Sequence, residues 1–179
     1  MRTAFIASLV FILFITVSSC RKDKYKPDEK IGIGGCMDEN SPFFNSIAAY
    51  DDGSCQFLYI TEYELVEYKD DEWDLLIGTN ADVYLKVKRQ TSSYWEFTSN
   101  SINNAGPSTA QIWTAPEQFQ LLNETYQWEL YDADSPPFDA DDLMASGSFN
   151  PVTGGIGGAV ISESSDGTTT VKIHFRLSQ

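Results

Sequence analysis

Hydrophobic and polar residues alternate with a period of two along most of the chain after Phe57, and this pattern constrains the fold more than any other feature. It is clearest over residues 60–66, 83–88 and 171–177. Successive side chains of a β-strand point to opposite faces of a sheet, so this period predicts strands with one buried face. Shorter runs of the same kind lie at 94–98, 111–114, 125–131, 143–149 and 156–162. Eight such segments without a helical period predict an all-β fold, an eight-stranded antiparallel β-sandwich.

The composition excludes two other classes of protein. Hydrophobic residues make up 42% of the chain and aromatic residues 13%, which is too many for a disordered segment. The formal net charge of −14 opposes binding to the phosphates of nucleic acid, so no nucleic-acid partner is expected. We assign the sandwich to residues 58–179, a length of about 120 residues that is enough for one domain with its own core.

Acidic residues gather in two segments, 70–84 and 131–142. The second places five aspartates within the eleven residues from Asp132 to Asp142, and no Lys, Arg or His lies between Gln90 and Val171. Carboxylates held close together repel one another unless a cation lies between them. A hard divalent cation with oxygen ligands, calcium above all, relieves that repulsion. The two segments therefore predict a metal site, and a solvated acidic loop is the alternative.

The N-terminus has the pattern of an export signal. Arg2 precedes an apolar run over residues 4–17, which is too short to span a bilayer as a mature helix. The run ends in Val-Ser-Ser-Cys at residues 17–20, which resembles the bacterial lipobox. This resemblance implies that residues 1–19 are a signal peptide and that Cys20 is acylated, whereas a secretory signal with a chance cysteine is the alternative. The lipid anchor would attach the protein to a membrane of the bacterial cell envelope, we expect the outer membrane, facing either the periplasm or the exterior.

Residues 20–35 are polar and glycine-terminated, which predicts a flexible tether. If Cys20 carries lipid, Cys36 and Cys55 remain as a pair, and export to an oxidising compartment favours a disulfide between them. Residues 36–57 also resemble a GC-x-D…DDGSC module common in secreted proteins of Bacteroidetes-type bacteria. Those modules look like calcium-binding loops, and a stapled spacer with an Asp-Gly turn is an equal alternative. The ligands implied for this module are Asp38, Asp51 and Asp52.

Four segments of the sandwich region resemble C2 domains. Residues 82–87, Asp-Val-Tyr-Leu-Lys-Val, resemble the Asp-Pro-Tyr-Val-Lys-Val strand of that family. Residues 126–134 resemble the strand that leads into the third calcium loop, and residues 142–147 resemble the strand that follows it. Residues 113–119 are similar to the Trp-Asn-Pro-x-Phe turn. The likeness covers residues from about 60 to 177 in the family's order, and it implies a C2-like eight-stranded sandwich.

In C2 domains, aspartates from two loops at one end of the sandwich bind calcium. Mapped by motif onto this chain, the resemblance implies the metal ligands Asp74, Asp82, Asp132, Asp134 and Asp142. The spacing from Asp74 to Asp82 is longer than usual, and Val83 replaces the family's proline. Possible substitutes are Asp70 or Asp71 for Asp74, and Asp139 or Asp141 for Asp142. Loop carbonyls and water would complete the six to eight oxygens that calcium takes.

These features predict an exported, lipid-anchored calcium-binding module that binds a membrane, glycan or protein surface when calcium is present. Its partners would be the membrane, through the anchor, and a phospholipid, glycan or protein. The alternative is a non-enzymatic structural or carbohydrate-binding lipoprotein of the same fold, with calcium structural or absent. Trp95 and Trp128 lie in strand patterns and are expected in the core rather than on a sugar platform. We expect no enzyme, because the aspartates are too dense to act as separate acid and base and no activated nucleophile accompanies them.

Overall fold

The computed structural model describes residues 31–71, 73, 80–134, 140–153 and 158–178. The chain divides into two units, Met1–Ile31 and Gly32–Gln179. Nearly all of the first unit, including the predicted signal peptide and Cys20, lies outside the described residues. No helix within the described ranges is long and apolar enough to cross a membrane. The boundaries predicted after residues 35 and 57 stay predictions.

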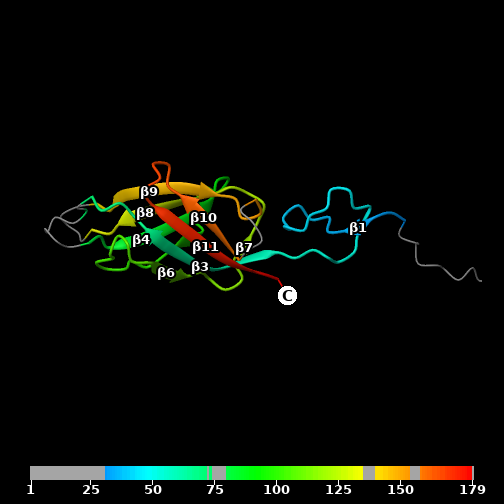
Figure 1. The fold of residues 1–179 in the computed structure, drawn as a ribbon, viewed down its shortest axis with the longest axis horizontal. Coiled ribbons are helices and arrows are strands. Elements are labelled where there is room, and N and C mark those ends of the chain that lie inside the picture. The colour runs from blue at the N-terminus through cyan, green and yellow to red at the C-terminus, as the bar shows by residue number, and fades with distance from the viewer. Residues whose placement is uncertain (1–30, 72, 74–79, 135–139, 154–157, 179) are drawn as a thin grey trace, which may run out of the picture. The chain divides into compact units, whose positions relative to one another are not determined.

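Two antiparallel sheets form the larger part of the second unit (Figure 1). The first sheet has the order β10–β11–β3–β6, and β7 also pairs with β3. Its strands are β3 (Leu58–Glu67), β6 (Gln111–Thr114), β7 (Gln120–Leu121), β10 (Ala159–Glu163) and β11 (Thr170–Leu177). The second sheet has the order β5–β4–β8–β9. Its strands are β4 (Val83–Arg89), β5 (Phe97–Thr98), β8 (Tyr126–Asp132) and β9 (Asp142–Phe149). The predicted all-β sandwich is confirmed, with each predicted segment contributing a strand.

The period of two breaks within β3 of the first sheet. Leu58 and Ile60 are buried, but farther along β3 the buried residues are Tyr63 and Leu65, so the alternation changes phase. The pairing with β11 skips Thr61, which therefore forms a β-bulge and shifts the following side chains to the opposite face. The two-residue strand β7 was not predicted, because two residues are too few to show a period.

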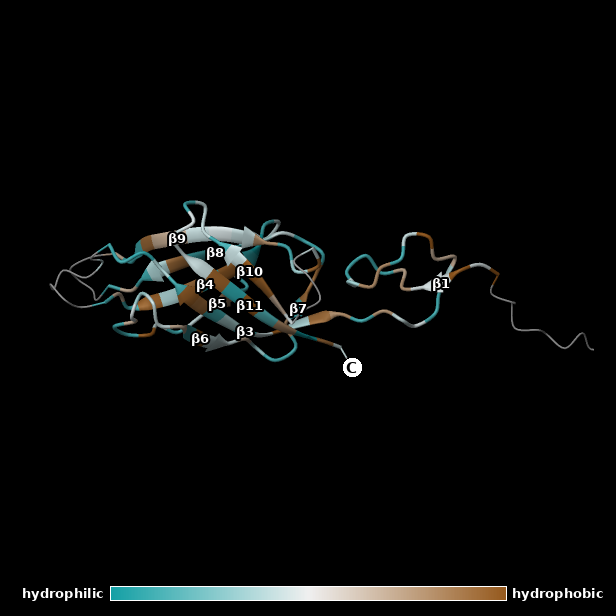
Figure 2. Cartoon of the chain, viewed as in Figure 1, coloured by the Kyte–Doolittle hydropathy of each residue, from teal (hydrophilic) through white to brown (hydrophobic). Residues whose placement is uncertain are grey.

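One hydrophobic core joins the facing sides of the two sheets, and Figure 2 shows hydrophobic residues concentrated along the strands. Trp128 on β8 is fully buried, and its indole Nε1 donates a hydrogen bond to Ser162 Oγ at 2.7 Å. Gly147 on β9 lies directly against this ring, since an added Cβ would come within 2.5 Å of Trp128 Cζ2 and 2.7 Å of the Glu163 carbonyl oxygen. Close packing at this point holds β8 and β9 in register.

The prediction that Trp95 belongs to the core is wrong, whereas the same prediction for Trp128 is confirmed. Strand β5 begins only at Phe97, so Trp95 lies in the loop before it and is half-buried. The ammonium group of Lys88 lies 4.7 Å from the centroid of the Trp95 ring. A run of strand-forming residues next to a short strand was mistaken for part of that strand.

The segment before the sandwich contains the predicted disulfide between Cys36 and Cys55. Its two short strands, β1 (Gly34–Gly35) and β2 (Tyr50–Asp51), pair in parallel. The carboxylate of Asp51 accepts the Gly53 N–H at 2.9 Å, and that of Asp52 accepts the Ser54 N–H at 3.0 Å. These hydrogen bonds form the Asp-Gly turn that was predicted if the segment is a disulfide-stapled spacer.

Candidate functional site: the acidic end of the sandwich

The strand register brings three of the five predicted ligands to one end of the second sheet. Asp132 is the last residue of β8, and it pairs with Val83 at the start of β4 and with Asp142 at the start of β9. Asp82 directly precedes Val83. Asp82, Asp132 and Asp142 therefore lie on three adjacent strands at the same end, which we call the acidic end.

Asp132 is the most enclosed of these residues, with 1% of its surface exposed. Its Oδ1 accepts the backbone N–H of Asp82 at 2.7 Å. The Asp82 carbonyl oxygen in turn accepts the Ala133 N–H at 2.8 Å. A buried carboxylate is costly unless hydrogen bonds support its charge, and a backbone N–H provides such support. These two bonds lock the end of β8 to the start of β4.

Asn104 also belongs to the acidic end, although the sequence analysis did not identify it. Its backbone N–H donates to Asp82 Oδ1 at 2.6 Å, and its side-chain Oδ1 accepts the Asn80 N–H at 2.8 Å. Asn104 has a positive φ of 53°, a conformation that asparagine tolerates better than most residues. The only signal in the sequence is the turn-forming composition of residues 103–107. Asn104 holds the Asp82 carboxylate in place from a separate loop.

Asp141, the proposed substitute for Asp142, accepts a hydrogen bond from the Tyr84 hydroxyl at its Oδ2, at 2.6 Å. Burial raises the pKa of the Tyr84 phenol, and this hydrogen bond to a carboxylate raises that pKa further. The phenol therefore remains a proton donor. Asp142 is exposed, and within the described ranges its carboxylate accepts no side-chain hydrogen bond like the one between Tyr84 and Asp141.

Asp134 lies two residues beyond Asp132 and is half-buried. Asp74 and the substitute Asp139 lie outside the described residues. The substitute Asp71 is less suited to a metal, because its Oδ2 lies 2.6 Å from the ammonium nitrogen of Lys69. That contact also raises the pKa of Lys69 through the Asp71 hydrogen bond, so the ammonium group stays charged.

The donor type at the acidic end suits calcium, because all the side chains there offer oxygen. Each carboxylate has two oxygens, and those of Asp82 and Asp132 are oriented by backbone N–H groups. Within the part of the chain that the structure describes, no group of three or more acidic, histidine or cysteine side chains is arranged to hold a metal ion. The complete set of five aspartates includes Asp74, so it stays a prediction.

No family model matches this chain, and no curated protein matches it. Solved structures similar to it include "Structure of a C2 domain", at 19% identity and a TM-score of 0.44 over 69% of this chain and 97% of the other. A human GIVD cytosolic phospholipase A2 in complex with methyl gamma-linolenyl fluorophosphonate matches at 17% identity and a TM-score of 0.43, over 69% of this chain and 17% of that enzyme.

A calcium-bound pair of C2 domains from extended synaptotagmin 2 matches at 18% identity and a TM-score of 0.37, over 69% of this chain and 44% of the other. The chain thus spans less than half of the phospholipase and of the synaptotagmin chains. C2 domains are among the matches, as the sequence resemblance implies. At these identities and TM-scores, the likeness says nothing about the ligands of this chain.

Proposed function

We propose that the acidic end binds calcium and, through it, attaches the protein to a surface that carries phosphate or carboxylate groups. The strand register supports this proposal most strongly, because it places Asp82, Asp132 and Asp142 at the same end of three adjacent strands. We also propose that Cys20 carries lipid, so that the protein is anchored in the bacterial cell envelope.

The proposed ligands are Asp82, Asp132, Asp134 and Asp142 of the described residues, together with Asp74. Bound calcium would neutralise these carboxylates and leave coordination positions for the oxygens of a partner. Asn104 and the Asp82 backbone fix two of the carboxylates by hydrogen bonds that need no ion. Such preorganisation lowers the entropy cost of gathering like charges around a cation.

Calorimetric titration with calcium tests the metal site. We predict that Asp132→Asn and Asp134→Asn each abolish binding, because asparagine keeps the shape of the side chain but not its charge. Asp166→Asn is the matched control. Hydroxyl groups of Ser164 and Thr168 lower the pKa of Asp166 to about 2, so its carboxylate is charged at neutral pH. Equal loss of affinity in all three variants would show that only the overall charge matters.

Attachment to a surface is tested separately from the anchor. Cys20→Ser should move the protein from the membrane fraction to the soluble fraction of cells. That variant, mixed with vesicles of anionic or neutral phospholipid, should sediment with the anionic vesicles in calcium and remain free in EDTA. Sedimentation that is equal with and without calcium would contradict the proposed role of the ion.

We further propose that the protein is not an enzyme. The five aspartates from Asp132 to Asp142 lie too close together in the sequence to act as a separate acid and base. Turnover of a chromogenic glycoside by the wild type, lost in Asp134→Asn, would overturn this proposal.

A further inference from the structure

The loop between β6 and β7 is held in an unusual conformation away from the acidic end. Both strands pair with β3, and residues 115–119 form the loop between them. The Ala115 N–H donates to the Thr61 carbonyl, and the Ile60 N–H donates to the Phe119 carbonyl, each at 3.0 Å. Gln118 at the tip has a φ of 67°, which is uncommon for a residue with a side chain. Such strain persists only where the surroundings enforce it, and it is often found at binding sites.

Three hollows surround this loop, with volumes of about 410, 480 and 550 Å³. Gln120 lines the first and the second, and Gln118 and Arg176 line the second and the third. Neighbouring hollows share these lining residues, and we call the three hollows together the loop groove. Arg89, which lines the first hollow, is the last residue of β4, and Asp82 directly precedes the first residue of that strand. The first hollow and the acidic end therefore lie at opposite ends of the second sheet.

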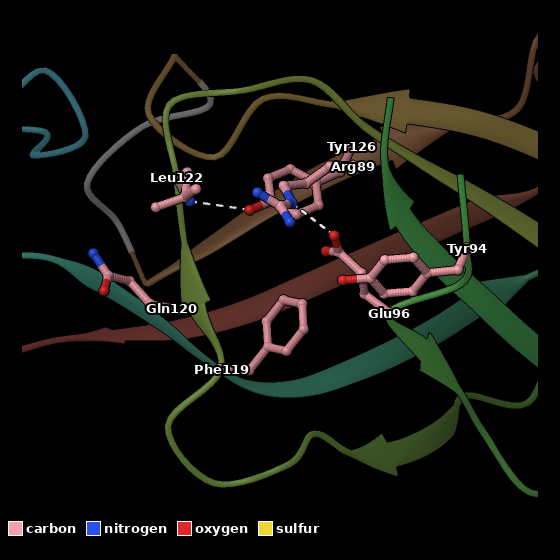
Figure 3. A pocket seen from close by; sticks show the side chains of 7 residues that line it. All are labelled: Arg89, Tyr94, Glu96, Phe119, Gln120, Leu122 and Tyr126. Atoms are coloured by element: carbon pink, nitrogen blue, oxygen red, sulfur yellow. Dashed lines mark hydrogen bonds and ion pairs between the residues drawn. The ribbon is translucent and has the colours of Figure 1, made fainter. Parts of the chain in front are cut away.

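The first hollow combines aromatic rings with planar polar groups (Figure 3). Tyr94 is 64% exposed, and Phe119 adds a second ring. Arg89 Nε donates to Glu96 Oε1 at 2.6 Å. Gln120 also lines the first hollow, although its amide group points away from the other labelled side chains in this view. The guanidinium has five N–H donors and the carboxylate four acceptor sites, so one mutual bond does not use up either group.

The second hollow repeats this combination, whereas the third hollow has polar and charged groups but no aromatic ring. The guanidinium carbon of Arg176 lies 5.2 Å from the centroid of the Tyr59 ring. Glu62 and Glu117 add carboxylates to the third hollow, beside the amide of Gln118. The groove thus offers charges of both signs in a chain with a formal net charge of −14. A strongly charged ligand would meet repulsion from one sign or the other.

We infer that the loop groove binds a neutral oligosaccharide. Each sugar hydroxyl both donates and accepts hydrogen bonds, so neighbouring hydroxyls match carboxylates, guanidinium groups and amides placed side by side. The apolar C–H face of a pyranose ring packs on an exposed aromatic ring such as that of Tyr94. A series of neighbouring hollows suits a chain of sugar units, and the net negative charge of the protein disfavours polyanions.

This inference does not depend on the proposed calcium site, and the test keeps the two apart. The full-length protein is run in native gels that contain a β-glucan, an α-glucan, a mannan or a xylan, and in gels with the anionic polysaccharide alginate, all in EDTA. We expect at least one neutral polysaccharide to retard it. Asp132→Asn should be retarded equally, since its substitution lies at the acidic end.

Two variants of the groove and one matched control decide the outcome. Tyr94→Ala and Gln120→Ala should each weaken the interaction with that polysaccharide about tenfold or more. Trp95→Ala removes the neighbouring half-buried aromatic residue, which does not line the first hollow, and should bind like the wild type. Thermal melts of the variants check that they remain folded. Retardation by alginate alone, by no neutral polysaccharide, or equally in all three variants would overturn the inference.

Discussion

Replacing Gly147 by alanine should destabilise the sandwich more than the same change at any other glycine that the structure describes there. The new Cβ would lie 2.5 Å from Trp128 Cζ2, whereas carbon atoms in contact are separated by about 3.5–4.0 Å. The Trp128 ring would have to move by about 1 Å to restore this contact distance. It cannot do so freely, because Nε1 is bonded to Ser162 Oγ at 2.7 Å, and this hydroxyl donates to the Ser148 carbonyl at 2.8 Å.

The expected cost has two parts. Overpacking a well-filled core costs about 1–3 kcal/mol. Weakening the buried hydrogen bond between Trp128 and Ser162 adds about 0.5–1.5 kcal/mol. Together they lower the free energy of unfolding of Gly147→Ala by about 2–4 kcal/mol and the melting temperature by roughly 5–15 °C.

Urea unfolding followed by tryptophan fluorescence measures this difference, with Gly167→Ala as the control. Gly167 has a φ of 72°, but no described atom lies within 4 Å of its added Cβ. The control therefore carries only backbone strain, about 1 kcal/mol. A loss in Gly147→Ala no greater than in Gly167→Ala would refute the close packing of Gly147 against the Trp128 ring.

Two further predictions concern stability. The Tyr63 hydroxyl is buried and has no hydrogen-bond partner among the described residues. Tyr63→Phe should therefore leave the free energy of unfolding unchanged or raise it by up to about 1 kcal/mol. A decrease of that size, measured by urea unfolding, would show that the hydroxyl has a partner. On the outer face of β3, Glu64 accepts a hydrogen bond from His174 Nε2 at 2.6 Å, which is the main cause that lowers the pKa of Glu64 from its ordinary value of 4.5. A carboxyl group with a lowered pKa stabilises the fold above pH 4.5 and loses this effect as the pH falls through its folded-state pKa. The difference in unfolding free energy between wild type and Glu64→Gln, at most about 1 kcal/mol near neutral pH, should therefore shrink at pH 3, and a constant difference would contradict the pairing.

The sandwich could be predicted from the sequence because its strands are half-buried, and half-burial leaves an alternating pattern. The pattern became misleading where tertiary structure broke the alternation. The bulge at Thr61 depends on the register with β11, which is a long-range property. The position of Trp95 depends on where β5 begins, and strand ends are set by pairing rather than by composition.

The acidic end was predictable in part for a similar reason. Asp82, Asp132 and Asp142 each lie at the boundary of a strand, so antiparallel pairing brings them together once the strands are known. Asn104 could not be predicted, because its role arises from a backbone N–H in a loop without a period. The loop groove depends on the positive φ of Gln118, and glutamine has no special preference for that conformation.

The most direct test of the calcium proposal is a thermal melt of the purified protein in excess EDTA, in millimolar calcium and in millimolar magnesium. Calcium at a hundredfold excess over its dissociation constant would stabilise the native state by about 2.7 kcal/mol. We predict a rise in melting temperature of several degrees in calcium and little change in magnesium, which prefers a smaller, octahedral set of ligands. Identical melting temperatures in calcium and EDTA, or an equal rise in magnesium, would contradict a calcium site at the acidic end.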